Sequence, residues 1–241
     1  MTKFHRISTT AIFLFYFAFF PYWIYNASLP QALVLFFVYW FISDVVQSLY
    51  LHRWAAHNLW SPPRWLQKTL GIIGVAANVG TPIGWAAWHR THHQHNDTDR
   101  DPHSPTHKSW WYVTFWTKFH RVETRRAVDR MRDDFLMKLN KYEGHISIVV
   151  NLIVAAILIP TLGLQWFLTL WALPSALTIV IVNFFVNVLL HKNGEPQDNA
   201  LFWPLLFTEC NHRKHHVGPM KLSYPGTWDI SGSIVKKLGW T

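Results

Sequence analysis

Histidines are the residues of this sequence best suited to chemistry, because nine of the 15 fall in spacings that metal sites use. They form a pair, two trios of identical spacing and one isolated residue: His52 and His57; His89, His92 and His93; His212, His215 and His216; and His191. On a helix, positions i+3 and i+4 lie within about 60° of position i, so each trio can face one cavity. The pattern therefore predicts that these imidazoles converge on a metal centre.

The number of imidazoles indicates two metal ions rather than one. A tetrahedral zinc takes four ligands. The last two histidines of each trio diverge by about 100°, which suits two neighbouring ions. His52 and His57 diverge by about 140° on an α-helix, so we expect a helix end between them. Imidazole binds iron, zinc and copper alike, and the ligand type leaves the metal open.

His191 follows a long apolar segment, with Asn187 one helical turn earlier on the same face. An ionisable group that emerges from an apolar helix is a functional candidate. Beside the three clusters, His191 is the expected ligand from that helix. Asn187 is expected to act through a water molecule or to support a ligand.

Other kinds of chemistry lack the residues that they require. The single cysteine, Cys210, excludes a disulfide framework, a four-cysteine zinc finger and an iron–sulfur cluster built from this chain alone; we expect it to be a small buried filler. The histidine clusters lack the glutamate of a His-Glu-x-x-His zinc protease, and no serine or cysteine nucleophile motif is evident. The sequence therefore favours redox chemistry at a two-metal centre.

The distribution of charge shows where this centre lies. Half of the 241 residues are hydrophobic, and all 22 Lys and Arg residues fall outside segments 11–50 and 145–190. Because a membrane-spanning helix needs about 20 apolar residues, each segment can cross a bilayer twice. Turn-forming residues at 26–30 and 160–165 divide them. We therefore expect two transmembrane hairpins; a soluble protein with two buried helical hairpins is the alternative.

Hairpins place both termini and the central segment on one side of the membrane, and all the basic residues lie there. By the positive-inside rule, that side is cytoplasmic. The net charge of +9 therefore reflects membrane topology, and we expect no nucleic-acid partner. Lys3 and Arg6 precede the first apolar run as in a signal peptide, but no cleavage site follows, so we interpret this run as an anchor.

Three segments of the central region carry weaker signals. Residues 70–88 are apolar but interrupted by glycines and a proline, and histidines on both sides must share one side of the membrane. We expect a helix that dips into or lies along the interface. The aromatic segment 109–119 resembles a second interfacial element. Segment 121–143 alternates charges like a water-exposed amphipathic helix, whose arginines could also steer an acidic electron-transfer partner.

The expected fold is thus an all-α membrane protein with four transmembrane helices under a cytosolic helical cap that carries the two-metal site. We expect a single domain over residues 1–241. Its parts are a hairpin at about 11–50, a cytosolic segment with the first two clusters at about 51–144, a hairpin at about 145–190, and a cytosolic C-terminal segment at about 191–241.

The histidine spacings closely resemble those of the membrane-bound fatty acyl desaturases, the family of stearoyl-CoA desaturase and its bacterial relatives. The matching motifs, in order, are His52-Arg-Trp-Ala-Ala-His57, His89-Arg-Thr-His-His93, Asp101-Pro-His103, Asn187-Val-Leu-Leu-His191 and Glu209-Cys-Asn-His212-Arg-Lys-His-His216. The resemblance covers roughly residues 40–230.

The resemblance implies two irons bound by these nine histidines, beside a kinked tunnel for an acyl chain. It further implies that Asn187 holds a water on one iron. Asp101 and His103 belong to the family pattern and are expected to support the second cluster. Glu209, three residues before His212, is expected to support that ligand from the same helical face.

The implied activity is oxygen-dependent desaturation in lipid metabolism, which gives a cis double bond and water. A separate cytochrome b5-type or ferredoxin-type donor is expected to supply electrons, because the sequence contains neither domain. Family members that act on acyl-CoA carry charged residues ahead of the second cluster, where this chain has Gly84-Trp-Ala-Ala-Trp88. The acyl carrier therefore stays open between CoA, a lipid and a carrier protein. His107 and Lys108 are candidates for head-group contacts or a solvated surface.

Two other functions compete with desaturation. A histidine-cluster hydroxylase or ketolase acting on an alkane, sterol or carotenoid would use the same iron chemistry. A non-catalytic membrane metal-binding or transport protein would line a path across the bilayer with histidines, whereas most of these histidines flank the apolar segments. Product analysis separates the first alternative, since a hydroxyl group would replace the double bond.

Overall fold

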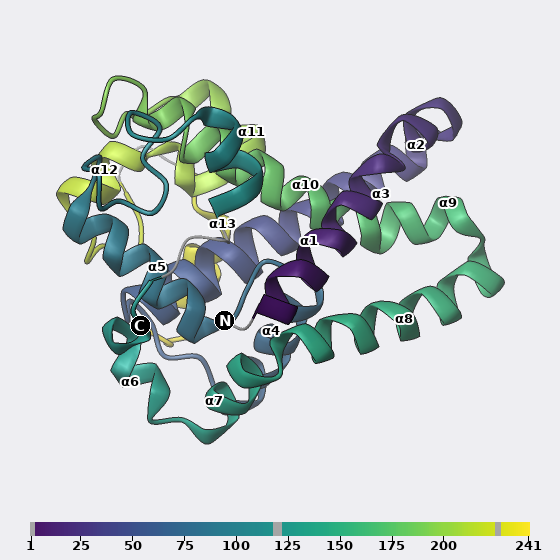
Figure 1. Cartoon of the computed structure of the whole chain (residues 1–241), viewed down its shortest axis with the longest axis horizontal. Coiled ribbons are helices and arrows are strands. Elements are labelled where there is room, and N and C mark those ends of the chain that lie inside the picture. Colours follow the sequence, from purple (N-terminus) through teal and green to yellow (C-terminus); the bar gives the residue numbers. More distant parts are fainter. Residues whose placement is uncertain (1–2, 118–121, 225–227) are drawn as a thin grey trace.

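The computed structural model describes residues 3–117, 122–224 and 228–241 (Figure 1). It is helical: among the described residues, the one β pairing is an isolated bridge between Asp198 and Asn211. Helix pairs extend to one end of the molecule, where α2 and α9 lie, while α5, α6 and α12 lie at the other end. Phe119 and Arg121, which belong to two of the expected helical segments, lie outside the described residues.

The four expected membrane helices are present as two hairpins. The first contains α1 (Lys3–Ala18), α2 (Phe20–Asn26), α3 (Leu29–Trp40) and the π-helix η1 (Phe41–Ala56). The second contains α8 (Glu143–Leu162), α9 (Leu164–Phe167), η5 (Leu168–Ala172), α10 (Leu173–Ile181), η6 (Val182–Val186) and η7 (Leu189–His191). Four stretches are long and apolar enough to cross a membrane: Arg6–Asn26, Leu29–Ala56, Glu143–Leu162 and Leu164–His191.

Local residues account for the turns of both hairpins. Ser28 and Gln31 form a capping box that starts α3, with the Ser28 N–H donating to the Gln31 side chain at 2.9 Å. Gly163 joins α8 to α9 with a φ of +87°, a conformation that a residue with a Cβ adopts poorly. The turns fall where the sequence predicts them.

Buried polar contacts hold the membrane helices together. The Tyr16 hydroxyl and the Trp171 indole both donate to the Asn151 side chain, at 2.5 and 2.7 Å, and link three spans. The Trp23 indole donates to the Thr169 hydroxyl at 2.8 Å. Because lipid provides little hydrophobic drive between helices, such bonds and close packing fix their arrangement.

The apolar segment 70–88 forms two helices rather than one. These are α4 (Arg64–Ala76) and α5 (Pro82–His95), and neither is among the four candidate spans. Asn78 and Gly80 have positive φ values in the connection, and the Thr81 side chain caps α5. The expectation that this segment does not span is confirmed, and the expectation of one continuous helix is wrong.

The charged segment 121–143 is also divided. It forms η4 (Thr124–Ala127), α6 (Val128–Met131) and α7 (Asp134–Lys141), where one amphipathic helix was expected. The Asp133 side chain accepts from the Leu136 N–H and starts a new helix inside the charge pattern. The remaining elements are η2 (Tyr112–Trp116), η8 (Ala200–Phe202), α11 (Trp203–Leu206), η9 (Phe207–Cys210), α12 (His212–Val217) and α13 (Ile230–Lys237).

Candidate metal centre

The structure brings all nine predicted histidines together as two adjacent groups. One group contains His52, His57, His89 and His215, and the other contains His92, His191, His212 and His216; the ligand nitrogens within each group lie within 4.8 Å of one another. His93 joins the first group, with its Nε2 atom 2.9 Å from that of His89 and 2.8 Å from that of His215. We call these the five-histidine group and the four-histidine group.

Helix geometry distributes the trios as the sequence predicts. On α5, His92 faces the four-histidine group and His93 the five-histidine group. On α12, His215 and His216 are divided in the same way. Neighbouring residues on a helix diverge by about 100°, so each trio supplies both groups.

The pair His52 and His57 is close for a reason that the sequence did not reveal. η1 is a π-helix, in which backbone hydrogen bonds join residues five apart, so such residues lie close to one face. The two rings lie 5.1 Å apart, centre to centre. The expected helix end is present, because η1 ends at Ala56 and His57 follows it directly. His52, however, lies inside a candidate span rather than outside the apolar segments.

The distances between nitrogens fit bound metal ions. The Nε2 atoms are separated by 2.8 Å between His57 and His89 and by 2.7 Å between His191 and His212. Ligands at about 2.1 Å from one ion lie about 3 Å apart when they are at right angles. Imidazole nitrogens at these separations repel each other unless a proton or a cation lies between them, so this donor set suits a cation in each group.

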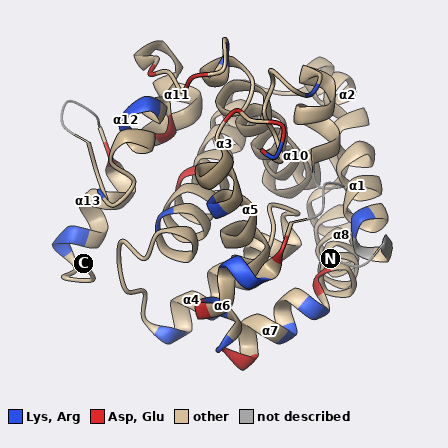
Figure 2. Ribbon diagram, turned by 60° about the vertical axis from the view of Figure 1, so that its left-hand side comes forward, with Lys and Arg blue, Asp and Glu red and all other residues tan. Residues whose placement is uncertain are grey.

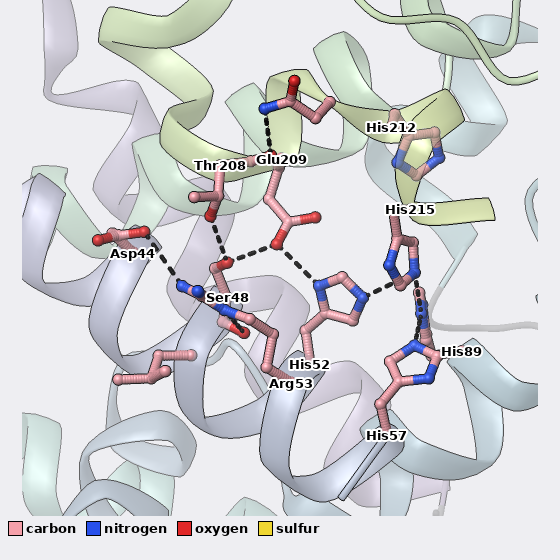
Figure 3. A network of polar contacts seen from close by, with 12 residues as sticks. Asp44, Ser48, His52, Arg53, His57, His89, Thr208, Glu209, His212 and His215 are labelled. Carbon is pink, nitrogen blue, oxygen red and sulfur yellow. Dashed lines mark hydrogen bonds and ion pairs between the residues drawn. The ribbon is translucent and has the colours of Figure 1, made fainter. Parts of the chain in front are cut away.

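Three carboxylates each accept a hydrogen bond from the Nδ1 atom of a clustered histidine. Asp101 contacts His92 at 2.8 Å, Asp97 contacts His191 at 2.7 Å, and Glu209 contacts His52 at 2.7 Å; the third contact is shown in Figure 3. Because an ionised carboxylate can only accept, Nδ1 carries the hydrogen and Nε2 keeps its lone pair for a metal.

Asp101 contacts a ring of the second cluster, and Glu209 contacts a ring of the first. Glu209 lies on η9 and contacts His52 and Ser48, not the expected His212 (Figure 3). Burial alone would raise the pKa of Glu209, but the neighbouring His52, Ser48 and Arg53 together outweigh it and the pKa is lowered. Its carboxylate is therefore ionised and can hold the His52 ring.

Sequence reasoning missed Asp97. It follows the second trio by four residues and lies at a φ of +54°, where its backbone N–H donates to Asp101. The Ser104 hydroxyl donates to its other carboxylate oxygen at 3.2 Å. The available signal was two aspartates, four residues apart, in one loop directly after the trio.

The loop that carries Asp101 also holds His103, which was predicted for the site, and His107 and Lys108, which were candidates for head-group contacts. The His103 ring stacks on His92, 4.2 Å away, and on Trp88, 5.5 Å away. Lys108 donates from Nζ to the Asp101 carbonyl at 2.5 Å, so this ammonium supports the loop. His107 is exposed, as a solvated surface residue would be.

Burial keeps five of the clustered imidazoles neutral. Burial, followed by neighbouring imidazoles, lowers the pKa of His57 to about 2 and that of His93 to about 3. The pKa values of three more are well below the usual value for the same reasons: His89, His212 and His215. A neutral imidazole is the form that binds a metal.

Two arginines hold the end of η1 against the second cluster. Arg90 donates to the Ala56 carbonyl at 2.8 Å, and Arg130 donates to the Trp54 carbonyl at 2.7 Å and the Ala55 carbonyl at 2.9 Å. Asp129 binds Arg90 through both oxygens, at 2.6 and 2.9 Å. The last carbonyls of a helix lack partners within it, so these contacts fix the residues before His57.

The charge pattern of segment 121–143 suggested that Arg130 belongs to a free surface patch. Its contacts with η1 show that it does not. Its guanidinium lies 4.4 Å from the centre of the Trp54 ring.

Asp44 has a structural role, since it pairs with Arg53 at 3.6 Å (Figure 3). Arg53 also binds Asp229 at 2.9 Å. Cys210 is buried, as expected of a filler.

A cavity of largely apolar lining reaches both groups. It contacts His52, His89, His92 and His212, and its apolar walls include Val79, Trp85, Phe115, Ile179, Val182 and Val186. Asn187 lines it too and donates to the Asn183 side chain at 3.3 Å. Asn183 in turn donates to the Thr114 carbonyl at 3.0 Å. An extended apolar molecule fits this lining.

The site defines a class of protein: a membrane protein with a histidine cluster suited to metal beside an apolar cavity. Comparison with known proteins gives the family. A model of the fatty acid desaturase family matches residues 26–225, and the chain belongs to this family. It is a fatty acyl desaturase, an oxidoreductase of lipid metabolism.

Curated relatives match most of the chain. An sn-1 stearoyl-lipid 9-desaturase of Anabaena variabilis is 32% identical over 83% of this chain and 75% of its own length. An sn-2 palmitoyl-lipid 9-desaturase of Nostoc sp. is 29% identical over 82% of this chain and 73% of its own. Delta-9 acyl-lipid desaturase 1 of Arabidopsis thaliana is 26% identical over 89% of this chain and 74% of its own length.

Proposed function

We propose that this protein introduces a cis double bond at position 9 of a saturated acyl chain carried by a membrane lipid. The cavity that passes the two histidine groups is the observation that carries this proposal. The reaction removes two hydrogens from adjacent methylenes and consumes O2, two electrons and two protons to give two waters. An unactivated methylene offers no charge or acidic proton to a side chain, so a cofactor must supply the reactivity.

A lipid is the acyl carrier that the residues favour. The relatives are named for stearoyl-lipid, palmitoyl-lipid and acyl-lipid substrates. The segment 84–88 of α5 contains no charged residue that could contact a CoA phosphate. An uncharged segment suits a substrate that arrives from the bilayer.

The proposed metal is iron, with one ion in each histidine group. The five-histidine group, with His93, can surround an ion, whereas the four-histidine group has one ligand fewer, and its His92 and His212 line the cavity together with Asn187. We assign Asn187 to a water on that ion. When bound, the irons supply oxygen activation; the carboxylates of Asp97, Asp101 and Glu209 orient the imidazoles.

The cavity residues position the substrate and exclude water. Apolar walls bind the acyl chain without polar contacts, so the distance between the bound ester and the histidines sets which carbon reacts. Trp85 and Phe115 are the aromatic residues named above among these walls. The depth of the cavity thus takes the place of polar recognition.

The rest of the assignment concerns topology and partners. We propose that the whole chain is one domain, with both termini and the metal centre on the cytoplasmic side, as the positions of its basic residues favour. A separate cytochrome b5-type or ferredoxin-type protein supplies the electrons. Membrane lipid serves both as solvent and as substrate.

Expression in a bacterium with a known lipid profile tests the proposal. Wild type should add one monounsaturated fatty acid with its double bond at position 9, detected by gas chromatography and mass spectrometry. His92→Ala should abolish the product, while the exposed His107→Ala should leave it unchanged. A hydroxylated fatty acid would identify a hydroxylase instead, and an unchanged product from His92→Ala would remove His92 from the site.

A further inference from the structure

α12 has two faces with different properties. At about 100° per residue, His212, His215 and His216 lie on one side of this helix. The opposite side carries Arg213, Lys214 and Val217, all exposed. The helix that holds three clustered histidines therefore also forms the outer surface of the protein at that point.

The exposed face continues into the turn after α12 and is both basic and apolar. Val217 is 81% exposed and Met220 is 69% exposed, and Lys221 is exposed beside them. Segment 211–222 contains no Asp or Glu. The Asp198 carboxylate does reach α12, but it accepts from the Lys214 backbone N–H, not from its ammonium. We call residues 213, 214, 217, 220 and 221 the α12 surface.

Several basic residues of the central segment already have partners. Arg90 pairs with Asp129 at 2.6 Å, and Arg125 pairs with Glu123 at 2.6 Å. Arg130 donates to backbone carbonyls at the end of η1. Arg125 and Arg130 are thus already engaged, whereas the α12 surface carries three exposed basic residues in a segment, 211–222, that contains no acid.

The α12 surface lies away from the membrane. Figure 1 shows α12 at the end of the molecule opposite to α2 and α9, which join the membrane helices. In Figure 2, its Lys and Arg residues appear in blue at the edge of the ribbon. A partner that approaches from water can therefore reach this surface.

We propose that the α12 surface is the docking site of the electron donor, a small acidic one-electron redox protein. This inference rests on the proposed function. Positive charge attracts an acidic partner, and exposed Val217 and Met220 provide the apolar contact at its centre. A helix with its side chains is about 10–12 Å thick, so a protein docked here lies about one helix from the histidines.

The path between this surface and the histidines is also covalent, because Arg213 follows His212 and Val217 follows His216 in the chain. Two donor molecules would each be oxidised by one electron per turnover, and a metal pair bound by the nine histidines would supply the redox chemistry that uses these two electrons. With two more electrons from the acyl chain, they reduce O2 to two waters; the acyl chain supplies two protons and the solvent supplies two.

Charge reversal tests the proposal. The protein in nanodiscs is assayed with reduced plant-type [2Fe–2S] ferredoxin, and separately with dithionite and methyl viologen. Arg213→Glu/Lys221→Glu should raise the KM for ferredoxin at least tenfold at low salt and leave the rate with the small reductants unchanged. The matched variant Lys236→Glu/Lys237→Glu, exposed on α13, should change that KM less than twofold.

Equal KM values in the two double variants would overturn the proposal. Charge reversal near α12 could lower activity by disturbing the metal centre. Direct binding of ferredoxin to the protein in nanodiscs does not depend on activity and therefore tests docking in that case. Lys221→Glu alone should weaken binding several-fold relative to Lys236→Glu, and equal affinities contradict docking at α12. If Lys221→Glu instead keeps its affinity for ferredoxin and loses binding to anionic vesicles, the surface binds lipid and the proposal is wrong. No double bond with either reductant would instead refute the proposed function.

Discussion

The two histidine groups are held in place by different means. In the four-histidine group, Asp97 and Asp101 contact the rings of His191 and His92 directly, and both aspartates belong to one loop. In the five-histidine group, among the described residues, one carboxylate, Glu209, contacts a ring. Arginines instead fix the backbone before His57.

The difference indicates what each group must do. Both groups border the cavity, but the four-histidine group has fewer imidazoles, so the orientation of each ring matters more and is set by hydrogen bonds. The five-histidine group has one imidazole more, and its geometry depends on the contacts that hold the end of η1 in place. The groups should therefore lose metal in response to different substitutions.

Removing one ligand from each group should give the largest contrast. His212→Ala leaves three imidazoles in its group, whereas His57→Ala leaves four in the other. We expect His212→Ala to bind about one metal ion per chain and make no product, and His57→Ala to keep more metal. Mass spectrometry of purified protein measures the metal content. Equal loss in both variants would remove the proposed difference in ligand number.

Removing a carboxylate should affect the four-histidine group next. Asp101→Ala removes the acceptor of the His92 Nδ1 hydrogen, and loss of such a contact weakens metal binding about 10–100-fold. The exposed Asp99→Ala, two residues away, is the matched control and should bind metal like wild type. Competition with a chelator measures both affinities. If the two variants behave alike, Asp101 does not position His92.

Weakening the arginine contacts should have the smallest effect, confined to the five-histidine group. Arg90→Lys keeps the charge but cannot contact Asp129 and two backbone carbonyls at once, so metal affinity should fall about tenfold. Arg64→Lys, in the more exposed pair with Asp133, should change nothing. Loss of metal from the four-histidine group in Arg90→Lys would contradict this assignment.

Hydropathy and helical spacing predicted the parts of the structure that depend on local sequence. Segments 11–50 and 145–190, which contain no Lys or Arg, became the hairpins, because an apolar helix of that length has few alternatives in a bilayer. The trio spacings predicted that His92 and His93 would face different groups. Both inferences needed only the geometry of an ideal helix.

Features that depend on contacts between distant segments could not be predicted in this way. The π-helix that brings His52 beside His57 has no residue signature that we used. The contact between Glu209 and His52 joins residues 157 positions apart. The charge pattern of segment 121–143 predicted a surface position for Arg130, whereas its guanidinium donates to the carbonyls of residues 54 and 55. Tertiary packing decided each of these.

Iron analysis of the purified wild-type protein, combined with product analysis of the same preparation, tests the central claim most directly. The nine histidines should bind two irons per chain in protein that forms the double bond, and stripping the iron with a chelator should abolish the product until iron is restored. A preparation that forms the double bond with no iron, or with one iron per chain at full activity, would contradict the account.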